Sequence, residues 1–502
     1  MHCKQDPLME LSLTRRVVIF IIGVVESMLF AGTVFGWPQL VHVFKVEGLY
    51  SHLCDDSTTL HHNHTARPPP AHNPFNNTRC WDRNTTFQFS SSHKVGVEQC
   101  EAQDERFALI FTVTVGCYSV PAVLVGFLLH HAGLRVTRVS AGTMMSMGFL
   151  FLGMATKESP NWVFVAMILM ALGGNQLRMS VMQFGDLFPL HRSTAITLLS
   201  GMYAASASLF LVFQYTADAG IARAHVCWVL AGISALSIFL SFIMPVHHIP
   251  VLDIYETREA TKDPPPLGKS LWSGSSYLHQ FWFFIMLFAI NVYQQTYNVW
   301  VTGSSCSVRE AGLYSMFFSY SNLFTVFFGP LGGAFTDYMV RRARDTPSEV
   351  GRRVKEIQAP FWPLLISSLA TTITYACILV FRPLAVYISL VAMVVARPCV
   401  IAVSTAYLRI RFPAEHFNRL LGIYGSVSSL LMFLQYPHFM WAQHMYYPAH
   451  ALVLALLVLS YTNPIHLLFT PLMRDAVVIR DQLEEEQLCP VRTLKKTFRE
   501  SP

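Results

Sequence analysis

The chain has 502 residues, of which 53% are hydrophobic and only 13% are charged, whereas about 25% charged residues are usual in soluble domains. Apolar runs of about 20 residues recur along nearly the whole length, as membrane-spanning helices require, so we expect a protein whose main surroundings are the lipid bilayer. The net charge of +6 does not indicate binding to nucleic acid, because the basic residues lie in short loops between apolar runs.

The first apolar run follows Arg15 and Arg16 and lacks a small-residue cleavage site, so we expect a retained helix rather than a signal peptide. Twelve spans are predicted, at about residues 17–42, 107–129, 139–157, 162–184, 194–216, 224–245, 278–302, 311–336, 360–381, 384–408, 418–441 and 449–471. Most of the basic residues lie in the loops predicted on one side of the membrane, and Arg135 and Arg138 are among these residues. The positive-inside rule therefore places both termini, including residues 1–16, in the cytosol.

The polar loop at residues 43–106 holds three acceptor sequons for N-glycosylation, which begin at Asn63, Asn76 and Asn84. Sequons together with cysteines are typical of an extracellular, oxidising location. We expect Cys54 and Cys100, which flank the middle of the loop, to form a disulfide, and the partner of Cys80 stays open. A His-His-Asn-His stretch in the same loop lacks a closed ligand set of recognised spacing, so no metal site is predicted.

Two stretches of similar pattern each end one apolar run and lead into the next. The clearer one runs from Gly333 through Asp337 to the paired Arg341 and Arg342, and a weaker copy lies at residues 126–138. A glycine, a carboxylate and paired arginines in a turn between membrane helices resemble the signature loop of the major facilitator superfamily. The resemblance implies gating roles for the motif residues Gly126, His130, Arg135, Gly333, Asp337, Arg341 and Arg342.

The repeated turn implies a duplicated six-helix unit. A second repeat occurs in the same order, since Phe188-Pro189 precedes the fifth predicted span and Phe412-Pro413 precedes the eleventh. The expected fold is therefore all-α and membrane-embedded, with 12 transmembrane helices in two halves, as in the major facilitator superfamily. The boundaries are residues 17–245 and 278–471 for the halves, 246–277 for a cytosolic linker and 472–502 for a cytosolic tail. Transporters of this plan bind substrate near mid-membrane, between the halves.

Three charged residues, Glu26, Arg178 and Arg397, lie deep within predicted spans. Glu26 follows Arg16 by ten residues, which corresponds to about 15 Å along a helix and places it near mid-bilayer. A charge there is costly and should face the protein interior with a partner. Spans 1, 4, 7 and 10 line the cavity in the superfamily that the turns resemble, so all three residues are candidates for substrate binding. The alternative is an ion pair that joins helices without contacting substrate.

Polar amides lie on one face of the seventh predicted span, at Asn291, Gln294, Gln295 and Asn298. Amides in a lipid-embedded helix need hydrogen-bond partners, and paired donor and acceptor groups match the edge of a heterocyclic base. We therefore predict that this face lines the cavity, with interhelical hydrogen bonding as the alternative. Weaker candidates of the same kind are Asn175, Gln176 and Gln435.

The motifs of membrane pumps and hydrolases do not occur in the sequence. No P-loop, nucleophile elbow or zincin motif is found, which argues against an ATP-driven pump and against an enzyme, and no motif implies a cofactor. Carriers driven by protons or sodium place several carboxylates in the membrane, whereas Glu26 is the clear mid-membrane carboxylate in this chain. These features favour facilitated, equilibrative transport.

Nearly the whole chain resembles solute carrier family 43. The stretches that carry the resemblance are Phe35-Gly-Trp-Pro38, Ala102-Gln-Asp-Glu-Arg-Phe107, His191-Arg-Ser-Thr194, His248-Ile-Pro250 and Phe412-Pro-Ala-Glu-His-Phe417. His191 and Glu415-His-Phe417 are most similar to the nucleobase-transporting member of that family. The resemblance implies sodium-independent facilitated uptake of purine bases such as adenine, guanine and hypoxanthine at the plasma membrane, with no obligatory protein partner.

Two departures from the family pattern affect the expected mechanism. Arg178 lies where an apolar residue is expected, so it could pair with Glu26 or change substrate preference. His130-His131 replaces the usual Asp-Arg of the first turn, which leaves Asp337 with most of the gating role and makes a mild pH dependence a hypothesis. A facilitator of large neutral amino acids stays an alternative, because Glu26 and Arg178 could hold an ammonium and a carboxylate. The other alternative is a receptor or scaffold without transport.

Overall fold

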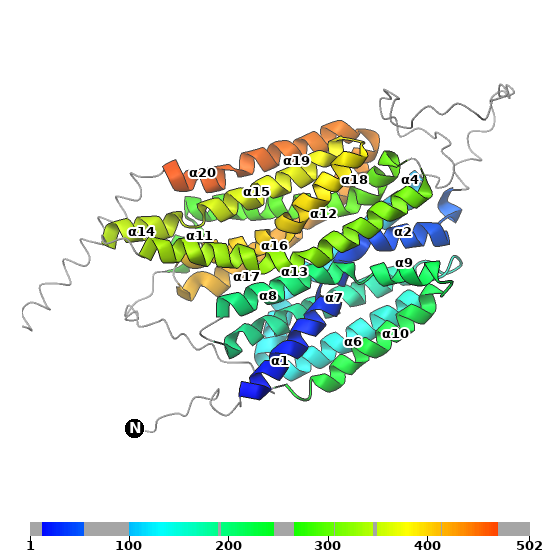
Figure 1. The fold of residues 1–502 in the computed structure, drawn as a ribbon, viewed down its shortest axis with the longest axis horizontal. Coiled ribbons are helices and arrows are strands. Elements are labelled where there is room, and N and C mark those ends of the chain that lie inside the picture. The colour runs from blue at the N-terminus through cyan, green and yellow to red at the C-terminus, as the bar shows by residue number, and fades with distance from the viewer. Residues whose placement is uncertain are drawn as a thin grey trace, which may run out of the picture.

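The computed structural model describes residues 13–54, 100–188, 192–244, 266–305, 307–344, 349–412 and 414–469, and these residues form helices and turns with no strand. Figure 1 shows long helices lying roughly side by side. The three sequons, Cys80 and most of the predicted linker and tail lie outside the described residues. The fold is all-α, as the apolar runs predict.

The helices fall into two groups along the chain. The N-terminal group consists of α1 (Leu13–Glu26), η1 (Ser27–Ala31), η2 (Thr33–Gly36), α2 (Trp37–Glu47), α4 (Glu101–Ser119), α5 (Ala122–His131), α6 (Gly133–Met154), α7 (Trp162–Met182), η3 (Gln183–Leu187), α8 (Arg192–Ala205), η5 (Ser206–Ser208), α9 (Leu211–Asp218) and α10 (Arg223–Leu240). The C-terminal group consists of α11 (Leu267–Leu271), α12 (Gly274–Ser304), α13 (Val308–Arg344), α14 (Glu349–Gln358), α15 (Phe361–Ala376), η6 (Cys377–Leu379), α16 (Pro383–Arg411), α17 (Ala414–Leu431), η7 (Met432–Leu434), α18 (Gln435–His444), α19 (Tyr446–Ser460) and α20 (Thr462–Phe469).

Each group packs mainly on itself, and a few helices meet at the boundary. In the N-terminal group α6 packs against α7 and α10, and in the C-terminal group α16 packs against α13 and α15. Across the boundary α8 packs along α13, which runs between the two groups in Figure 1, while α2 contacts α12 and α4 contacts α18. The boundary between the groups is therefore formed mainly by α2, α4 and α8 on one side and by α12, α13, α16, α17 and α18 on the other.

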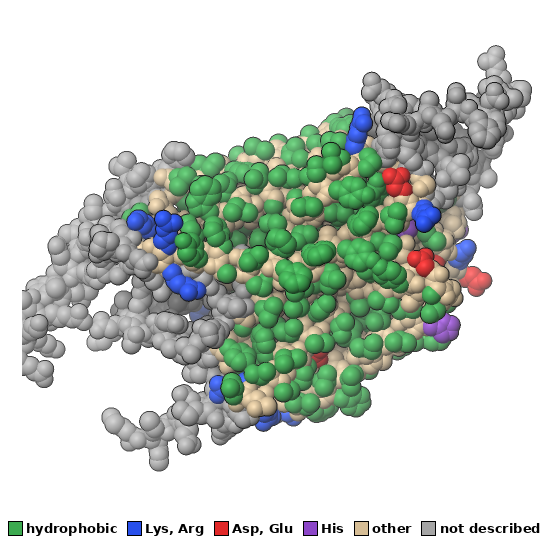
Figure 2. Space-filling view, viewed as in Figure 1, with side chains coloured by type: hydrophobic (Ala, Val, Ile, Leu, Met, Phe, Trp, Pro, Cys, Tyr) green, Lys and Arg blue, Asp and Glu red, His purple; other side chains and the backbone are tan. Residues whose placement is uncertain are grey.

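The surface suits a bilayer. Figure 2 shows hydrophobic side chains over the long face of the molecule, with charged side chains mainly toward its two ends. Large apolar side chains are strongly exposed along the helices, for example Leu124, Phe327 and Val391, and soluble proteins rarely expose apolar patches of such extent. Among the described residues eight helices are long and apolar enough to cross a membrane, or nine if one bent pair counts as a span. The full set of 12 stays a prediction.

The first span is broken, whereas residues 17–42 were expected to form one helix. Its two pieces, residues 13–31 and 33–47, meet at Gly32 with a bend of 42°. The backbone N–H of Gly32 donates to the Ser206 hydroxyl at 2.8 Å, and a Cβ at this position would lie 2.7 Å from the Tyr203 ring. Glycine thus permits a close approach of η5 and α8 to the break.

The prediction of a turn at residues 333–342 is wrong, because these residues belong to α13, which continues without interruption to Arg344. The alanines, methionine and three arginines of residues 333–344 are good helix formers that offset the weak ones such as Gly333 and Thr336, and no proline follows Pro330 before the helix ends. The basic segment that follows also contains a helix, α14, rather than an extended loop. The earlier copy does turn: only Ala132 separates α5 from α6, and Gly133 adopts φ 83°, which favours glycine.

Candidate functional site

Glu26 lies at the end of α1 and is bound by Arg138 rather than by Arg178. One carboxylate oxygen accepts from the Arg138 guanidinium and the other accepts from the Ser237 hydroxyl. Arg138 is fully buried in α6, so its expected place in a cytosolic loop is wrong. Sequence reasoning missed this partner because Arg138 directly precedes the predicted start of the third span. The pair ties α1 to α6 and α10.

Arg178 lies on α7 and points toward aromatic rings. Its guanidinium carbon lies 5.8 Å from the centroid of Tyr118 and 5.6 Å from that of Tyr203. One of its terminal nitrogens donates to the Asn175 side-chain oxygen at 3.2 Å, one helical turn earlier on α7. Arg178 is half-buried, and its contacts are an amide and two rings.

Arg397 approaches the same rings from α16, on the other side of the boundary. Its guanidinium carbon lies 5.1 Å from the centroid of Phe35, and it donates to the Asn322 side-chain oxygen at 2.6 Å. Phe35 in turn contacts the rings of Tyr118 and Tyr203. The side chain is 7% exposed. Two guanidinium groups from different helix groups thus face one set of aromatic rings.

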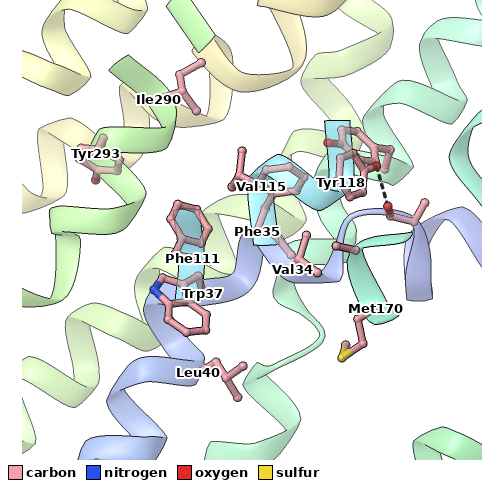
Figure 3. Close-up of a cluster of buried hydrophobic side chains, with 14 of the residues drawn as sticks. Val34, Phe35, Trp37, Leu40, Phe111, Val115, Tyr118, Met170, Ile290 and Tyr293 are labelled. Atoms are coloured by element: carbon pink, nitrogen blue, oxygen red, sulfur yellow. Dashed lines mark hydrogen bonds between the residues drawn. The ribbon is translucent and has the colours of Figure 1, made fainter. Parts of the chain in front are cut away.

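The rings that connect the two arginines are Phe35 in η2, Tyr118 in α4 and Tyr203 in α8. Phe35 meets Tyr118 edge to face at 5.1 Å and Tyr203 at 6.1 Å between centroids. Figure 3 shows Phe35 beside Tyr118 and the hydrogen bond of the Tyr118 hydroxyl to the carbonyl of Ala31, which measures 2.9 Å. Phe35 and Tyr118 were not among the predicted site residues, because single aromatics in apolar runs usually pack or anchor membrane helices.

Two of the four amides on α12 form hydrogen bonds to other helices. This is the alternative to lining the cavity that the sequence left open. Gln295 donates to the Ala108 carbonyl at 3.1 Å and to the Thr112 hydroxyl at 3.2 Å. Asn298 donates to the Pro38 carbonyl at 2.6 Å. These bonds connect the C-terminal group to α2 and α4.

The remaining amides leave polar atoms without partners. Asn291 bonds to the Leu287 carbonyl of its own helix at 2.8 Å, and its oxygen has no partner. Gln294 and Gln435 are fully buried, and both polar atoms of each amide lack a hydrogen-bond partner. Gln176 contacts the Met144 sulfur at 3.6 Å and leaves its oxygen unsatisfied. Buried polar atoms without partners are costly, so they indicate places where water or a polar ligand can bind.

Besides the packing of α8 along α13, several hydrogen bonds join the two groups at the end where α2 ends and α4 begins, which we call the loop end. There the Tyr436 hydroxyl donates to Glu105 at 3.0 Å, and Gln443 donates to the Glu101 carbonyl at 3.3 Å. A cavity of about 300 Å³ lies beside them, lined by Leu53, Ala102, Glu105, Arg106, Leu109 and Tyr436. Cys54 and Cys100 are joined by a disulfide at this end.

The predicted gating residues lie on α5, α6 and α13. Arg135 donates to the carbonyls of Phe242 and Met244 at 3.2 and 3.0 Å, so it ties α6 to the end of α10. Arg341 and Arg342 are exposed near the end of α13. Gly126 and Gly333 lie within α5 and α13, whereas the side chains of His130 and Asp337 lie outside the described residues. The gating roles therefore stay predictions.

No family model matches the chain. The chain is 24% identical to equilibrative nucleobase transporter 1 of Bos taurus over 474 residues, which make up 85% of this chain and 90% of that relative. It is 26% identical over 239 residues to large neutral amino acids transporter small subunit 3 of Homo sapiens, which covers 47% of this chain and 38% of that relative. The Mus musculus protein of the same name matches at 26% over 239 residues. These relatives are transporters and not enzymes.

Proposed function

We propose that this chain, a multi-pass transporter of the solute carrier family 43 type, carries purine nucleobases across the plasma membrane by sodium-independent facilitated transport. The proposed substrates are adenine, guanine and hypoxanthine. The bovine relative supports this choice, because its similarity extends over 85% of the chain, whereas the amino acid transporters match over 47%.

The observation that carries the proposal is the set of rings and arginines between the helix groups. Planar bases stack on aromatic rings, and a base bound here would insert among Phe35, Tyr118 and Tyr203, which are at most 8% exposed in this structure. The Arg178 and Arg397 guanidiniums lie within 5.8 Å of these rings, and arginine pairs well with the O6 and N7 acceptors of guanine, whereas adenine offers N7 alone on this edge. A base stacked on the rings would place its edge against one or both guanidiniums.

The position of Glu26 weighs against the amino acid alternative. A zwitterionic amino acid needs a cation for its carboxylate and an acceptor, usually a carboxylate, for its ammonium. Both oxygens of Glu26 are already used by Arg138 and Ser237, and no ion pair joins Glu26 to Arg178. Glu26 is therefore better suited to holding helices together than to binding substrate.

The contacts at the loop end support an alternating-access mechanism. Tyr436 with Glu105, Asn298 with Pro38, and Gln295 with Ala108 hold the two groups together there. If the loop end faces outward and both termini lie in the cytosol, this arrangement corresponds to a carrier closed toward the outside. Opening would require these hydrogen bonds to break while the groups rock about the central site.

Uptake of radiolabelled adenine and leucine in cells that express the chain tests the proposal. Adenine uptake that exceeds that of mock-transfected cells and is unchanged when choline replaces sodium is the expected result. Uptake of leucine alone would establish the amino acid alternative. Uptake of neither substrate, with the protein present at the cell surface, would favour the receptor or scaffold.

A further inference from the structure

Arg178 and Arg397 have no carboxylate partner among the described side chains. Among the side chains that the structure describes, no ion pair joins either guanidinium to an acidic residue. The acceptors that they contact are the neutral amide oxygens of Asn175 and Asn322. The charge of each arginine is therefore solvated by amides and rings rather than neutralised.

The buried carboxylates in the described part of the chain are already neutralised by other cations. Glu26 pairs with Arg138, and Asp104 pairs with Lys45, with every side chain in these two pairs at most 5% exposed. The less buried Glu47 pairs with Arg223 at 2.8 Å. Within the described residues, no buried acidic group thus stays available for the two central arginines.

An uncompensated pair of positive charges inside a membrane protein is unfavourable. Desolvating one charge costs several kcal/mol unless an opposite charge or good hydrogen bonds replace the water. Cation–π contacts with Phe35, Tyr118 and Tyr203 offset roughly 0.5–2 kcal/mol each, but the rings carry no net charge. The site is therefore electrostatically suited to a negatively charged ligand.

Three buried atoms on the two arginines and on Asn175 are hydrogen-bond donors without a partner. They are the Nε atom of Arg178, one terminal nitrogen of Arg397 and the side-chain nitrogen of Asn175, each buried without a partner. Neutral adenine presents both donors and acceptors along its edges. A deprotonated oxypurine presents carbonyl oxygens and an anionic ring nitrogen, so it offers more of the acceptors that these three donors lack.

From these observations we propose that the central site selects purines that carry a negative charge, in preference to neutral purines of the same size. This inference rests on the proposed nucleobase transport and specifies the substrate class of the same site. The ring of the anion stacks against Phe35, Tyr118 and Tyr203, while its acceptors receive hydrogen bonds from Arg178 and Arg397. Neither arginine moves across the membrane with the substrate. Transport of each anion therefore moves one net negative charge across the membrane and is electrogenic.

Uptake into proteoliposomes that contain the purified full chain tests this selectivity. Urate, an oxypurine anion at neutral pH, is compared with adenine and hypoxanthine, which are neutral. We expect urate to inhibit labelled adenine uptake at a concentration about tenfold lower than hypoxanthine does, the ratio that one charge-assisted hydrogen bond supplies. A potassium–valinomycin potential that makes the interior positive should raise the initial rate of urate uptake and leave adenine uptake unchanged.

The variants Arg178→Gln and Arg178→Lys test whether Arg178 is responsible for the preference for anionic purines. Arg382→Gln, at an exposed position, is the matched control. Arg178→Gln should weaken adenine uptake, because it removes a donor from the purine site, and should weaken urate inhibition about tenfold more than that, because the charge-assisted bond is lost as well. Arg178→Lys should restore part of the urate effect, because it keeps the charge without the planar fork. The control should match the unmodified chain.

The outcomes separate the inference from the function on which it rests. Adenine uptake with no effect of urate, or equal losses for both purines in Arg178→Gln, overturns the inference and leaves nucleobase transport intact. Absence of uptake of any purine overturns both. Adenine uptake that requires chloride, measured by replacement with gluconate, would show that the arginines bind an inorganic anion and would also overturn the inference. If Arg178→Gln cannot be purified, two measurements on the unmodified chain decide whether the site prefers anionic purines. They are the inhibition of adenine uptake by urate and the dependence of urate uptake on the membrane potential.

Discussion

At the scale of single residues, the most consequential contact is the buried ion pair of Glu26 and Arg138. Its partner could not be identified from the sequence, because Arg138 follows a glycine-containing turn and reads as part of a basic loop. The signal that could have found it is the requirement that Glu26 have a cation nearby. Arg138 is the residue immediately before the third predicted span, at residues 139–157.

Replacing Glu26 by glutamine should destabilise the fold rather than weaken substrate binding alone. The change leaves Arg138 buried without a counter-charge, and loss of one partner of a buried pair costs about 3–5 kcal/mol. We expect a clear drop in the melting temperature of the detergent-purified protein, partly recovered when Arg138→Gln is added. An unchanged melting temperature together with lost adenine uptake would instead place Glu26 in the substrate site.

The Tyr203 ring should matter more than its hydroxyl. Stacking of a base on an aromatic ring contributes about 1–3 kcal/mol, so Tyr203→Ala should raise KM for adenine about tenfold. Tyr203→Phe keeps the ring and is the matched variant, expected to stay near the unmodified value. Equal effects of both variants would argue against stacking at this position. The measurement is initial adenine uptake as a function of concentration, normalised to protein at the cell surface.

At the scale of helices, the apolar runs of the sequence predicted where most membrane helices lie but not where a helix is broken. Spans such as 162–184 and 384–408 were predicted close to their observed bounds, because period and length suffice for a continuous apolar helix. The break at Gly32 could not be predicted, since it depends on Ser206, which is 174 residues away. The continuation of α13 through Arg341 also contradicts the expected turn, because good helix formers outweighed the motif.

Gly32→Ala should impair folding or transport, whereas Gly232→Ala should not. A Cβ at Gly32 would lie 2.7 Å from the Tyr203 ring and 2.9 Å from the Ser206 hydroxyl, so backbone or ring must shift. A Cβ at Gly232 meets nothing within 4 Å, and alanine suits the α10 helix better than glycine. Surface expression and adenine uptake of both variants check this. Normal behaviour of Gly32→Ala would show that the break tolerates a side chain.

At the scale of the whole molecule, the two helix groups enclose the arginines and rings and meet through hydrogen bonds at the loop end. The sequence predicted a site between two halves from its repeated turns, and the rings and arginines lie where the helix groups meet. It could not predict which amides would join the groups. Gln295 and Gln294 are adjacent on α12, yet Gln295 bonds to Ala108 and Gln294 has no partner, a difference that depends on the packing of α4.

Locking the loop end should stop transport. The Tyr436 hydroxyl lies 3.0 Å from the Glu105 carboxylate, so the double variant Glu105→Cys, Tyr436→Cys should form a cross-link with a short bifunctional thiol reagent. We expect adenine uptake to fall to background after cross-linking, while each single variant keeps its uptake under the same treatment. Full uptake in the cross-linked double variant would mean that the loop end does not open during transport.

Exchange of adenine across a proteoliposome membrane tests the central claim most directly, because an equilibrative carrier moves substrate in both directions through one site. Vesicles that contain the purified chain are preloaded with unlabelled adenine, leucine or buffer, and entry of labelled adenine is followed in sodium and in choline medium. Internal adenine should accelerate entry over buffer, internal leucine should not, and the rates should be equal in the two media. Acceleration by leucine alone, or entry that requires sodium, would contradict facilitated purine transport by this chain.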